Sequence, residues 1–409
     1  MSRVLTAHNC RSCGGRPLHP VLDLGEQPLA NGLRDPSETG EEARFPLAIV
    51  LCPACSLVQL STTVPPEMLF DEYLYFSSYS TTMTSAMEAL ASSVVAERGL
   101  GASSLVVEAA SNDGYLLQHY ARIGVPVLGI EPARNIAATA TAAGIPTLAQ
   151  YFGAELADEL VAAGKTADVF HANNVLAHVP DLNGFVAGIA RILKPRGVAI
   201  IETPYVSELV AKTEFDTIYH EHVFYFSVTA LVQLFRRHGL VIADIERLSI
   251  HGGSLRIFAE PMGVQGDVVR RLLAEESAAL ISKPAYYEGF AGRVADLGKR
   301  CLSLLSELRR SGHSIAAYGA AAKGAVLLNH FGIGADLLDF VVDSNEYKQG
   351  LVMPGVGIPV SAPSRLLTDQ PDYTLLLAWN IADEVLQQQT EYRSRGGRFI
   401  VPIPDLKVV

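Results

Sequence analysis

The pattern of apolar and polar positions changes twice along this chain. Residues 1 to about 70 contain short apolar runs among many turn residues, which predicts a small module of short strands with little helix. A helix is expected over about 82–98, and from Ser103 buried strands alternate with helices, as in a parallel sheet. A turn is expected at 193–197. Strands of this sheet are expected to begin near Ser104, Val127, Asp168 and Val198.

A second unit of strands and helices follows the first. Two amphipathic helices are predicted between about 266 and 311, separated at 282–284 because proline interrupts a helix. Another strand, small-residue turn and helix begin at Ser314, and later strands are expected near Leu375 and Phe399. We therefore predict an α/β protein of three parts, residues 1–75, 76–265 and 266–409.

Composition indicates an ordinary globular protein with a large core. The chain has 409 residues, 49% of them hydrophobic and 18% charged, and its formal net charge is −11. This negative charge argues against a nucleic-acid partner, whose phosphates would repel it. No apolar run reaches membrane-spanning length, and residues 1–10 lack the apolar core of a signal peptide. We therefore expect a cytoplasmic monomer that binds neither membrane nor nucleic acid.

Four of the five cysteines form two pairs with metal-ligand spacing. The pairs are Cys10-Arg-Ser-Cys13 and Cys52-Pro-Ala-Cys55, and this spacing lets the thiolates converge on one tetrahedral ion. Because four protein ligands leave no open position, we predict a structural zinc site. A redox dithiol is the alternative, but it needs only one pair, and cytosolic disulfides are uncommon. Cys301 stands alone in a helical pattern and is expected in the core.

The first strand of the parallel sheet runs into a turn rich in small residues. The turn reads Glu108-Ala-Ala-Ser-Asn-Asp-Gly114, and the next strand ends in an acid, Glu131, 23 residues after Glu108. An acid at that place can bind both hydroxyls of a ribose. These motifs, in this order, resemble the class I S-adenosylmethionine-dependent methyltransferase fold over about residues 82–245. The fold's usual acid-x-Gly-x-Gly-x-Gly pattern keeps only its last glycine here. This favours S-adenosylmethionine over a dinucleotide, whose pyrophosphate needs close glycine contact.

The resemblance implies a cofactor site at the carboxyl ends of the strands. Phe152 is the candidate for stacking on adenine, and Glu131 for holding the ribose. His178 follows the fourth strand and would point into the same cleft if its segment turns. The alternative is an αβ core without function. The residues assigned to the cofactor are Tyr73, Glu108, Asn112, Asp113, Gly114, Glu131, Phe152, Asn173 and Asn174.

Residues 215–226 place titratable side chains among apolar ones, reading Phe-Asp-Thr-Ile-Tyr-His-Glu-His-Val-Phe-Tyr-Phe. Such surroundings shift pKa values, as a general base working near neutral pH requires. In a strand, Tyr219 and His222 would face opposite ways, whereas in a helical turn they share a face at i, i+3. A joint site of these two residues therefore favours a turn or loop. The alternative is an aromatic wall of hydrogen-bonded core residues.

Three further segments carry candidate binding residues. Tyr73, Tyr75 and Tyr79 could pack in the core or bring phenols to a cleft. His251-Gly-Gly-Ser-Leu-Arg256 would let a polar substrate approach Ser254 and Arg256 closely, although a hairpin explains the glycines equally well.

The third segment, Gly319-Ala-Ala-Ala-Lys323, places a lysine in a small-residue turn at a predicted helix start. By geometry and charge this is a phosphate site, although it is not the longer P-loop pattern. Asp343 closes the next strand, and Asn380 lies at a sheet end. We assign His251, Ser254, Arg256, Lys323, Asp343 and Asn380 to the substrate.

Across nearly the whole chain these motifs together resemble one family, the sugar C-methyltransferases. That family acts on dTDP-4-keto-2,6-dideoxyhexoses in the biosynthesis of antibiotic deoxysugars. The resemblance implies a zinc-binding domain, a cofactor-binding domain and a C-terminal Rossmann-like domain that helps to bind the nucleotide sugar. It also implies methylation at C-3, with His222 as the base. Around the sugar it implies Tyr219, Glu221, His178 and one tyrosine of the Tyr73/Tyr75 pair, which we assign as Tyr75.

The chemistry of C-methylation agrees with these residue types. The ketone next to C-3 makes its proton removable as an enolate, so the site needs a base and donors for the enolate oxygen. Tyr219 would orient the sugar or take the enolate charge, Glu221 would fix the imidazole tautomer, and His178 would donate to the carbonyl. The family's Tyr-Asp-Glu-His reads Tyr-His-Glu-His here, so His220 puts the local hydrogen bonding in question. The alternatives are methylation at another carbon such as C-5, O- or N-methylation of a nucleotide sugar, and a non-catalytic zinc-bearing scaffold.

Overall fold

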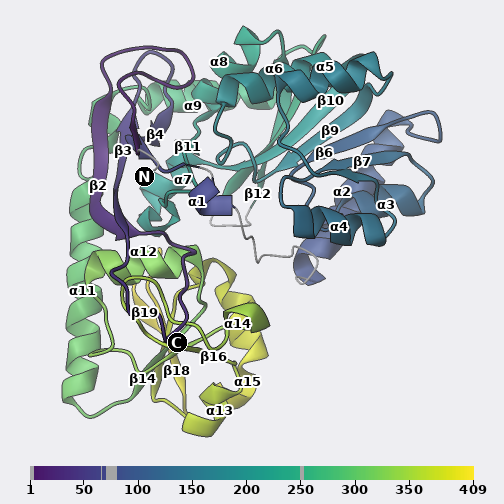
Figure 1. The fold of residues 1–409 in the computed structure, drawn as a ribbon. Helices are drawn as coiled ribbons and strands as arrows, with labels where there is room; N and C mark the ends of the chain where they lie inside the picture. Colours follow the sequence, from purple (N-terminus) through teal and green to yellow (C-terminus); the bar gives the residue numbers. More distant parts are fainter. Residues whose placement is uncertain (1–3, 66, 71–80, 249–252) are drawn as a thin grey trace.

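The structure, a computed structural model, describes residues 4–65, 67–70, 81–248 and 253–409. An N-terminal module, a central α/β domain and a C-terminal α/β domain follow one another along the chain (Figure 1). The long helix α11 (Phe290–Arg310) runs beside the N-terminal strands and continues along the C-terminal domain. Within the part of the chain described, no helix is both long and apolar enough to cross a bilayer.

The N-terminal module is built on an antiparallel sheet whose edge strand comes from a distant segment. The strand order is β11-β4-β3-β2. The strands are β2 (His19–Pro28), β3 (Arg44–Leu51), β4 (Val58–Leu60) and β11 (Phe224–Tyr225). A separate pair is formed by β1 (Leu5–Thr6) and β5 (Thr62–Thr63), and helix α1 (Glu67–Phe70) follows. Because Phe224 pairs with Gln59, the 215–226 segment is tied directly to this module.

The module packs on both larger domains. Alternate residues of β3 are buried, Leu47, Ile49 and Leu51, and they belong to the same core as Phe290 and Val294 of α11. The loops that carry the cysteines instead join the core of the central domain. The N-terminal module therefore holds the two α/β domains in a fixed arrangement around it.

The central domain contains a seven-stranded sheet in the order β12-β13-β10-β9-β6-β7-β8. Its strands are β6 (Val106–Ala109), β7 (Val127–Ile130), β8 (Thr147–Leu148), β9 (Ala167–Asn173), β10 (Leu193–Pro204), β12 (Val241–Leu248) and β13 (Ser254–Glu260). Strand β13 is antiparallel to both of its neighbours, and the other pairs are parallel. This order is that of the class I methyltransferase fold, so the predicted fold class is confirmed.

Helices precede, separate and follow these strands along the chain. They are α2 (Thr81–Arg98), α3 (Leu117–Arg122), α4 (Arg134–Ala142), α5 (Ala154–Ala162), α6 (Leu182–Ile192), α7 (Val206–Ala211), α8 (Val228–Arg237) and α9 (Asp267–Ala278). Helix α8 shows how the sequence sets a helix start and a buried face. Ser227 caps its first turn by accepting from the amide of Ala230 (3.0 Å), and Leu231, Leu234 and Phe235 form one apolar stripe that is buried.

One sequence expectation in this domain was wrong. The turn predicted at 193–197 is an irregularity inside β10, where Leu193 pairs with Ala167 and regular pairing resumes only at Val198. Residues 194–197 form an irregular bulge within β10, because Leu193 before them and Val198 after them both pair with β9.

The C-terminal domain has a six-stranded sheet in the order β16-β15-β14-β17-β18-β19. Its strands are β14 (Ile315–Tyr318), β15 (Val341–Val342), β16 (Val360–Ser361), β17 (Tyr373–Leu376), β18 (Arg398–Val401) and β19 (Lys407–Val408). Its helices are α10 (Pro284–Tyr287), α12 (Ala322–Phe331), η4 (Glu346–Lys348), α13 (Arg365–Asp369), η5 (Trp379–Ile381), α14 (Ala382–Gln388) and α15 (Thr390–Ser394). The parallel strands and intervening helices confirm the predicted Rossmann-like character.

Candidate active site

One cavity of about 1800 Å³ lies where the three parts of the chain meet. Asn31 lines it from the N-terminal module, Glu131 and Asn173 line it from the strand ends of the central sheet, and Lys323 lines it from the C-terminal domain. Single-ligand pockets commonly measure about 300–1,000 Å³. The cavity therefore has room for two ligands side by side.

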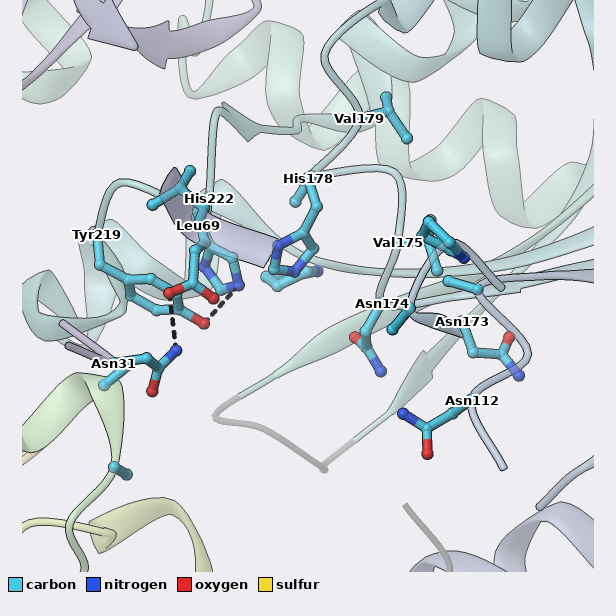
Figure 2. Close-up of a pocket in the computed structure, with 18 of the residues that line it drawn as sticks. Asn31, Leu69, Asn112, Asn173, Asn174, Val175, His178, Val179, Tyr219 and His222 are labelled. Carbon is cyan, nitrogen blue, oxygen red and sulfur yellow. Dashed lines mark hydrogen bonds between the residues drawn. The ribbon is translucent and has the colours of Figure 1, made fainter. Parts of the chain in front are cut away.

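Two groups of polar side chains face each other across this cavity (Figure 2). Tyr219, His222 and His178 form one group, from the 215–226 segment and the loop after β9. Asn112 and Asn173 belong to the other group, which follows the carboxyl ends of β6 and β9. Open parallel sheets bind ligands at this edge.

Tyr219 and His222 form a hydrogen-bonded pair within a tight turn. The amide of His222 donates to the carbonyl of Tyr219 (2.9 Å), and the two ring centroids lie 4.0 Å apart. Nε2 of His222 is 2.7 Å from the Tyr219 hydroxyl, and Nδ1 is 2.9 Å from the carbonyl of Thr217. A carbonyl only accepts, so Nδ1 carries the proton of the neutral ring and Nε2 keeps the lone pair. The expected shared face at i, i+3 is confirmed.

Backbone contacts hold this turn on both sides. It follows the short helix η2 (Phe215–Thr217) and precedes β11. The amide of Val223 donates to the carbonyl of Ala177 (2.8 Å), and the amide of Leu60 donates to the carbonyl of Val223 (2.9 Å). The turn is therefore fixed to the loop after β9 and to the N-terminal sheet at the same point.

His178 lies against His222 from the loop after β9. The two rings meet edge to face, with centroids 4.6 Å apart. Burial lowers the pKa of His178 to about 4, while a hydrogen bond to the backbone carbonyl of Glu221 acts in the opposite direction, so the imidazole is neutral at neutral pH. Nδ1 of His178 has no hydrogen-bond partner among the residues described. This nitrogen is therefore available to a ligand in the cavity.

Glu221 and His220, which share the turn, reach different partners. Glu221 accepts from the side-chain amide of Asn31 (2.7 Å), and burial raises its pKa to about 7. His220 lies 3.3 Å from the carbonyl of Phe45 in β3 and is not among the residues that line the described cavity. The role expected for Glu221 needs correction, because the Thr217 carbonyl fixes the imidazole tautomer. The additional histidine packs against the N-terminal sheet.

The turn after β6 has the backbone shape of a three-glycine turn. Ala110, Asn112 and Gly114 occupy the three glycine positions and have φ values of 51°, 50° and 83°. Asparagine tolerates the left-handed region, but for alanine it is strained, by about 1–3 kcal/mol. A Cβ on Gly114 would lie 2.9 Å from the side chain of Ile145. Such strain concentrates at ligand sites, so the turn keeps the cofactor-binding shape without two of its glycines.

Glu131 follows β7 beside this turn and lines the cavity. Its two oxygens accept from the amides of Asn112 (3.0 Å) and Ala133 (2.9 Å). Burial raises the pKa of Glu131, and these two hydrogen bonds act in the opposite direction. Each oxygen retains a further lone pair, which suits a ribose hydroxyl.

The remaining cofactor candidates on the cavity wall are Asn173, Asn174 and Phe152. Oδ1 of Asn173 is buried and has no partner within the described chain, and Asn174 has a φ of 56°. The ring of Phe152 packs against Phe170, with centroids 4.7 Å apart. An unpartnered amide oxygen, a ribose-type acid and an aromatic edge together fit S-adenosylmethionine.

Three assigned cofactor residues are not among those that line the described cavity: Glu108, Asp113 and Gly114. Burial raises the pKa of Glu108 well above its usual range, and the nearby Glu131 adds to this effect. Gly114 acts through its backbone conformation. These three residues belong to the end of β6 and the turn after it but do not line the described cavity.

The C-terminal domain lines the other end of the cavity with Lys323, Asp343 and Asn380. Asp343 accepts from two backbone amides, at 2.7 and 2.8 Å, and so closes the loop around it. Nζ of Lys323 lies 4.6 Å from the ring centroid of Trp379 and lacks a hydrogen-bond partner in the described part of the chain. Gly319 has a φ of 100°, and a Cβ there would lie 2.8 Å from the Cβ of Ala378.

Other assigned residues are separated from this cavity. Arg256 pairs with Glu202 (2.7 Å) and Glu246 (2.9 Å) within the central sheet, and Ser254 is buried at the start of β13. Neither lines the described cavity. Our assignment of both to the substrate is corrected accordingly, because the ion pairs occupy the guanidinium. Tyr73, Tyr75, Tyr79 and His251 lie outside the described residues.

The four paired cysteines converge in space, as their spacing predicted. Their sulfurs all lie within 4.8 Å of one another, with Cys10–Cys55 at 3.5 Å and Cys13–Cys52 at 3.6 Å. A tetrahedral zinc ion with Zn–S bonds of about 2.3 Å needs sulfurs roughly 3.8 Å apart. The cluster therefore fits zinc with all four positions filled by protein.

Both cysteine pairs use the same backbone knuckle. The amide of Gly14 donates to the carbonyl of Cys10, and the amide of Ser56 to the carbonyl of Cys52, both at 2.8 Å. The residue after each pair is left-handed, with φ of 74° at Gly14 and 63° at Ser56. This matched geometry turns both thiols of a pair toward one point.

Family comparisons match the chain in three consecutive segments. They are a zinc binding domain over residues 10–70, a methyltransferase domain over 83–245 and a C-methyltransferase C-terminal domain over 249–404. The C-methyltransferase NovU of Streptomyces niveus is 37% identical over 404 residues, which cover 98% of this chain and 96% of that protein. The chain belongs to this C-methyltransferase family. The predicted family and the predicted class, an S-adenosylmethionine-dependent C-methyltransferase, are confirmed.

Other similarities are confined to part of the chain. A ubiquinone biosynthesis O-methyltransferase of Rhizobium etli is 30% identical over 99 residues, 24% of this chain and 40% of that protein. The crystal structure of magnesium protoporphyrin IX methyltransferase from Synechocystis with bound S-adenosylmethionine is 16% identical. It covers 43% of this chain and 78% of its own, with a TM-score of 0.34.

Sequence reasoning missed two contributors to the site, Asn31 and Thr217. Asn31 lies 190 positions from Glu221, its partner, and its only signal was the Asn-Gly pair that marks a turn. Thr217 acts through its backbone carbonyl, which leaves no trace in the residue type.

Proposed function

We propose that this protein transfers a methyl group from S-adenosylmethionine to C-3 of a dTDP-4-keto-2,6-dideoxyhexose through an enolate. The observation that carries the proposal is the Tyr219–His222 pair, whose basic nitrogen faces the cavity that Glu131 and Asn173 also line. The proton acceptor and the residues assigned to the cofactor thus line the same cavity. C-methylation requires this, because the base and the methyl donor must both reach one carbon.

His222 is the general base in this proposal. Its Nε2 holds the lone pair because Nδ1–H donates to the Thr217 carbonyl. The proton leaves C-3 for Nε2, either directly or through the Tyr219 hydroxyl, which donates its own proton to Nε2 at 2.7 Å. The C–H electron pair becomes the enolate, and the carbonyl oxygen takes the charge.

In this proposal neutral His178 carries its one N–H on Nδ1, the nitrogen without a partner in the described chain, and donates it to the developing oxyanion. The ring lies edge to face on His222, so the donor and the base meet the sugar from adjacent directions. Preorganised donors of this kind stabilise an enolate more than a ketone. Bound S-adenosylmethionine supplies an electrophilic methyl group to the carbon nucleophile.

The nucleotide half of the substrate is assigned to the C-terminal domain. Lys323 lines that end of the same cavity with Asp343 and Asn380. One cavity that reaches from the histidine pair to this lysine supports a long substrate with a sugar at one end and a diphosphate and base at the other. Similarity to the C-methyltransferase NovU over nearly the whole chain supports carbon as the acceptor atom.

The test is a panel of dTDP-sugars with and without a 4-keto group, supplied with S-adenosylmethionine labelled in its methyl carbon. We expect one methylated product, with the label located at C-3 by NMR, and no transfer to 4-hydroxy analogues. Label at another carbon would move the reaction centre, and label on oxygen or nitrogen would refute the enolate. Calorimetry that detects no S-adenosylmethionine binding would favour the non-catalytic scaffold.

A further inference from the structure

Three consecutive residues of η2 connect the catalytic turn to the C-terminal domain. Phe215 is fully buried against α12. Asp216, also fully buried, accepts a hydrogen bond from Nε1 of Trp379 at 2.7 Å. Thr217 supplies the carbonyl that orients the imidazole of His222. A shift of η2 relative to the C-terminal domain would therefore move the base.

Trp379 contacts a carboxyl group and an ammonium group at once. Its N–H donates to Asp216, and its ring face lies 4.6 Å from Nζ of Lys323. Burial raises the pKa of Asp216 to about 7, while Lys323 and the Trp379 hydrogen bond act in the opposite direction. Glu214, which precedes η2 and lines the cavity, also interacts with Lys323. The groups that face Asp216 from the packed elements are thus Glu214, Lys323 and Trp379.

Packing alone does not account for a carboxylate here. Oδ1 of Asp216 is buried without a hydrogen-bond partner among the residues that the structure describes. Such a group costs stability, and an apolar side chain of similar size would avoid that cost. The carboxylate does, however, anchor the residue next to Thr217 to an indole in another domain, at a distance of 163 positions in sequence.

We propose that Asp216 and Trp379 are positioning residues that hold the Tyr219–His222 pair in its reactive orientation from the C-terminal domain. The inference rests on the proposed function, because it concerns the residue assigned as the base. Its consequence is that the domain assigned to the nucleotide half also sets the geometry of proton removal. The competing view treats the contact as domain packing alone, and it predicts a change in stability without a change in kcat.

Two substitutions separate the parts of this contact. Trp379→Phe keeps an aromatic ring face for Lys323 but removes the N–H donor. Asp216→Asn removes the titratable carboxyl but keeps an oxygen that can accept from Trp379. The matched control is Tyr392→Phe, which also removes a buried aromatic donor in the C-terminal domain, the hydroxyl that donates to the carbonyl of Pro371 (2.8 Å). Tyr392 is not among the residues that line the described cavity.

The measurements are kcat, KM for the nucleotide sugar, solvent deuterium exchange at C-3, and thermal stability. Misplacing a catalytic group by about 1 Å can cost roughly 100-fold in rate. We expect Trp379→Phe to lower kcat and exchange by about 10–100-fold while KM changes by less than about threefold. Asp216→Asn should lose less kcat than Trp379→Phe, because its amide oxygen can still accept from the indole N–H. Tyr392→Phe should lower the melting temperature but leave kcat unchanged.

The double variant gives the sharpest outcome. If Asp216 and Trp379 act through one contact, Asp216→Ala combined with Trp379→Phe should lose no more kcat than the worse single variant. Additive losses, or kcat within about twofold of wild type in folded Trp379→Phe, would overturn the inference while the wild type stays active. A wild type that methylates no keto-sugar would instead overturn the proposed function. Trp379 is the only tryptophan. If Trp379→Phe fails to fold, unchanged tryptophan emission and unchanged kcat in Asp216→Asn and Asp216→Ala would also overturn the inference.

Discussion

Tyr219→Phe changes the catalytic pair by one atom. It removes the hydroxyl that donates to Nε2 of His222 at 2.7 Å and leaves the ring that lies 4.0 Å from the imidazole. His222→Asn removes the imidazole, and its amide can still donate to the Thr217 carbonyl but is not basic. The two variants therefore separate the base from the group that is hydrogen-bonded to it.

The expected losses differ in size. Removing a general base typically costs about 10²–10⁴-fold in rate. The imidazole of His222 becomes charged as it takes the proton, and a hydrogen bond to a charged group contributes about 1.5–3 kcal/mol. Since about 1.4 kcal/mol corresponds to a tenfold change in rate, Tyr219→Phe should cost about 10–100-fold. His222→Asn should be the slower variant.

Two assays report the step directly. The loss of the C-3 proton is followed by NMR as solvent deuterium exchange in the 4-keto sugar, and turnover is followed with labelled S-adenosylmethionine. His222→Asn should suppress both, while calorimetry finds unchanged affinity for the cofactor. His178→Asn should slow methylation and leave some exchange, because it removes a donor and not the base.

One pattern would refute the assignment. If His222→Asn keeps near-wild-type exchange while Tyr219→Phe or His178→Asn abolishes exchange and turnover together, the base is another residue. If both members of the pair lose exchange equally, the proton passes through the tyrosine oxygen on its way to Nε2.

Three further predictions concern the metal, the substrate and pH. Metal analysis should find about one zinc ion per chain, and Cys52→Ser should release it and lower the melting temperature. Lys323→Ala should weaken binding of the nucleotide sugar by calorimetry but not that of S-adenosylmethionine, whereas Lys299→Ala, an exposed control, should change neither; the reverse pattern would exchange the two sites. The pKa of Glu221 is raised from 4.5 to about 7, so folding favours its protonated form. Its contribution is complete below about pH 4 and is lost as pH rises through 7, which amounts to about 3 kcal/mol. Denaturation experiments should therefore find a lower free energy of unfolding at pH 8 than at pH 5, and this difference should be smaller in Glu221→Gln. An equal difference in the wild type and the variant would contradict the raised pKa of Glu221.

Local features of the site were predictable from the sequence because local spacing determines them. Tyr219 and His222 meet at i, i+3, and two cysteine pairs converge on one ion, whatever the rest of the chain does. The parallel pairing of the first strands of the central sheet followed from the alternation of strands and helices. The carboxyl ends of parallel strands must lie at one edge, so Glu131 and Asn173 were expected in a single cavity.

Contacts between distant segments were not predictable in this way. Nothing local to Asn31 indicates that it meets Glu221, and nothing local to Trp379 indicates Asp216. Arg256 was misassigned for the same reason, since its ion pair with Glu202 forms only when β13 lies beside β10. Such pairings depend on how three domains pack, which residue type and spacing do not encode separately.

The same packing explains why a structural metal belongs in this enzyme. The knuckle of Cys52 and Cys55 forms the connection between β3 and β4, and β4 pairs with β11 directly after the catalytic turn. From the other side, η2 is anchored to the C-terminal domain by Asp216 and Trp379. The turn that carries His222 is thus held by contacts on both sides, to the N-terminal module through β11 and to the C-terminal domain through η2. Chelating the metal should therefore slow proton removal through loss of the β4–β11 register, even though the central sheet that binds the cofactor contains no zinc ligand.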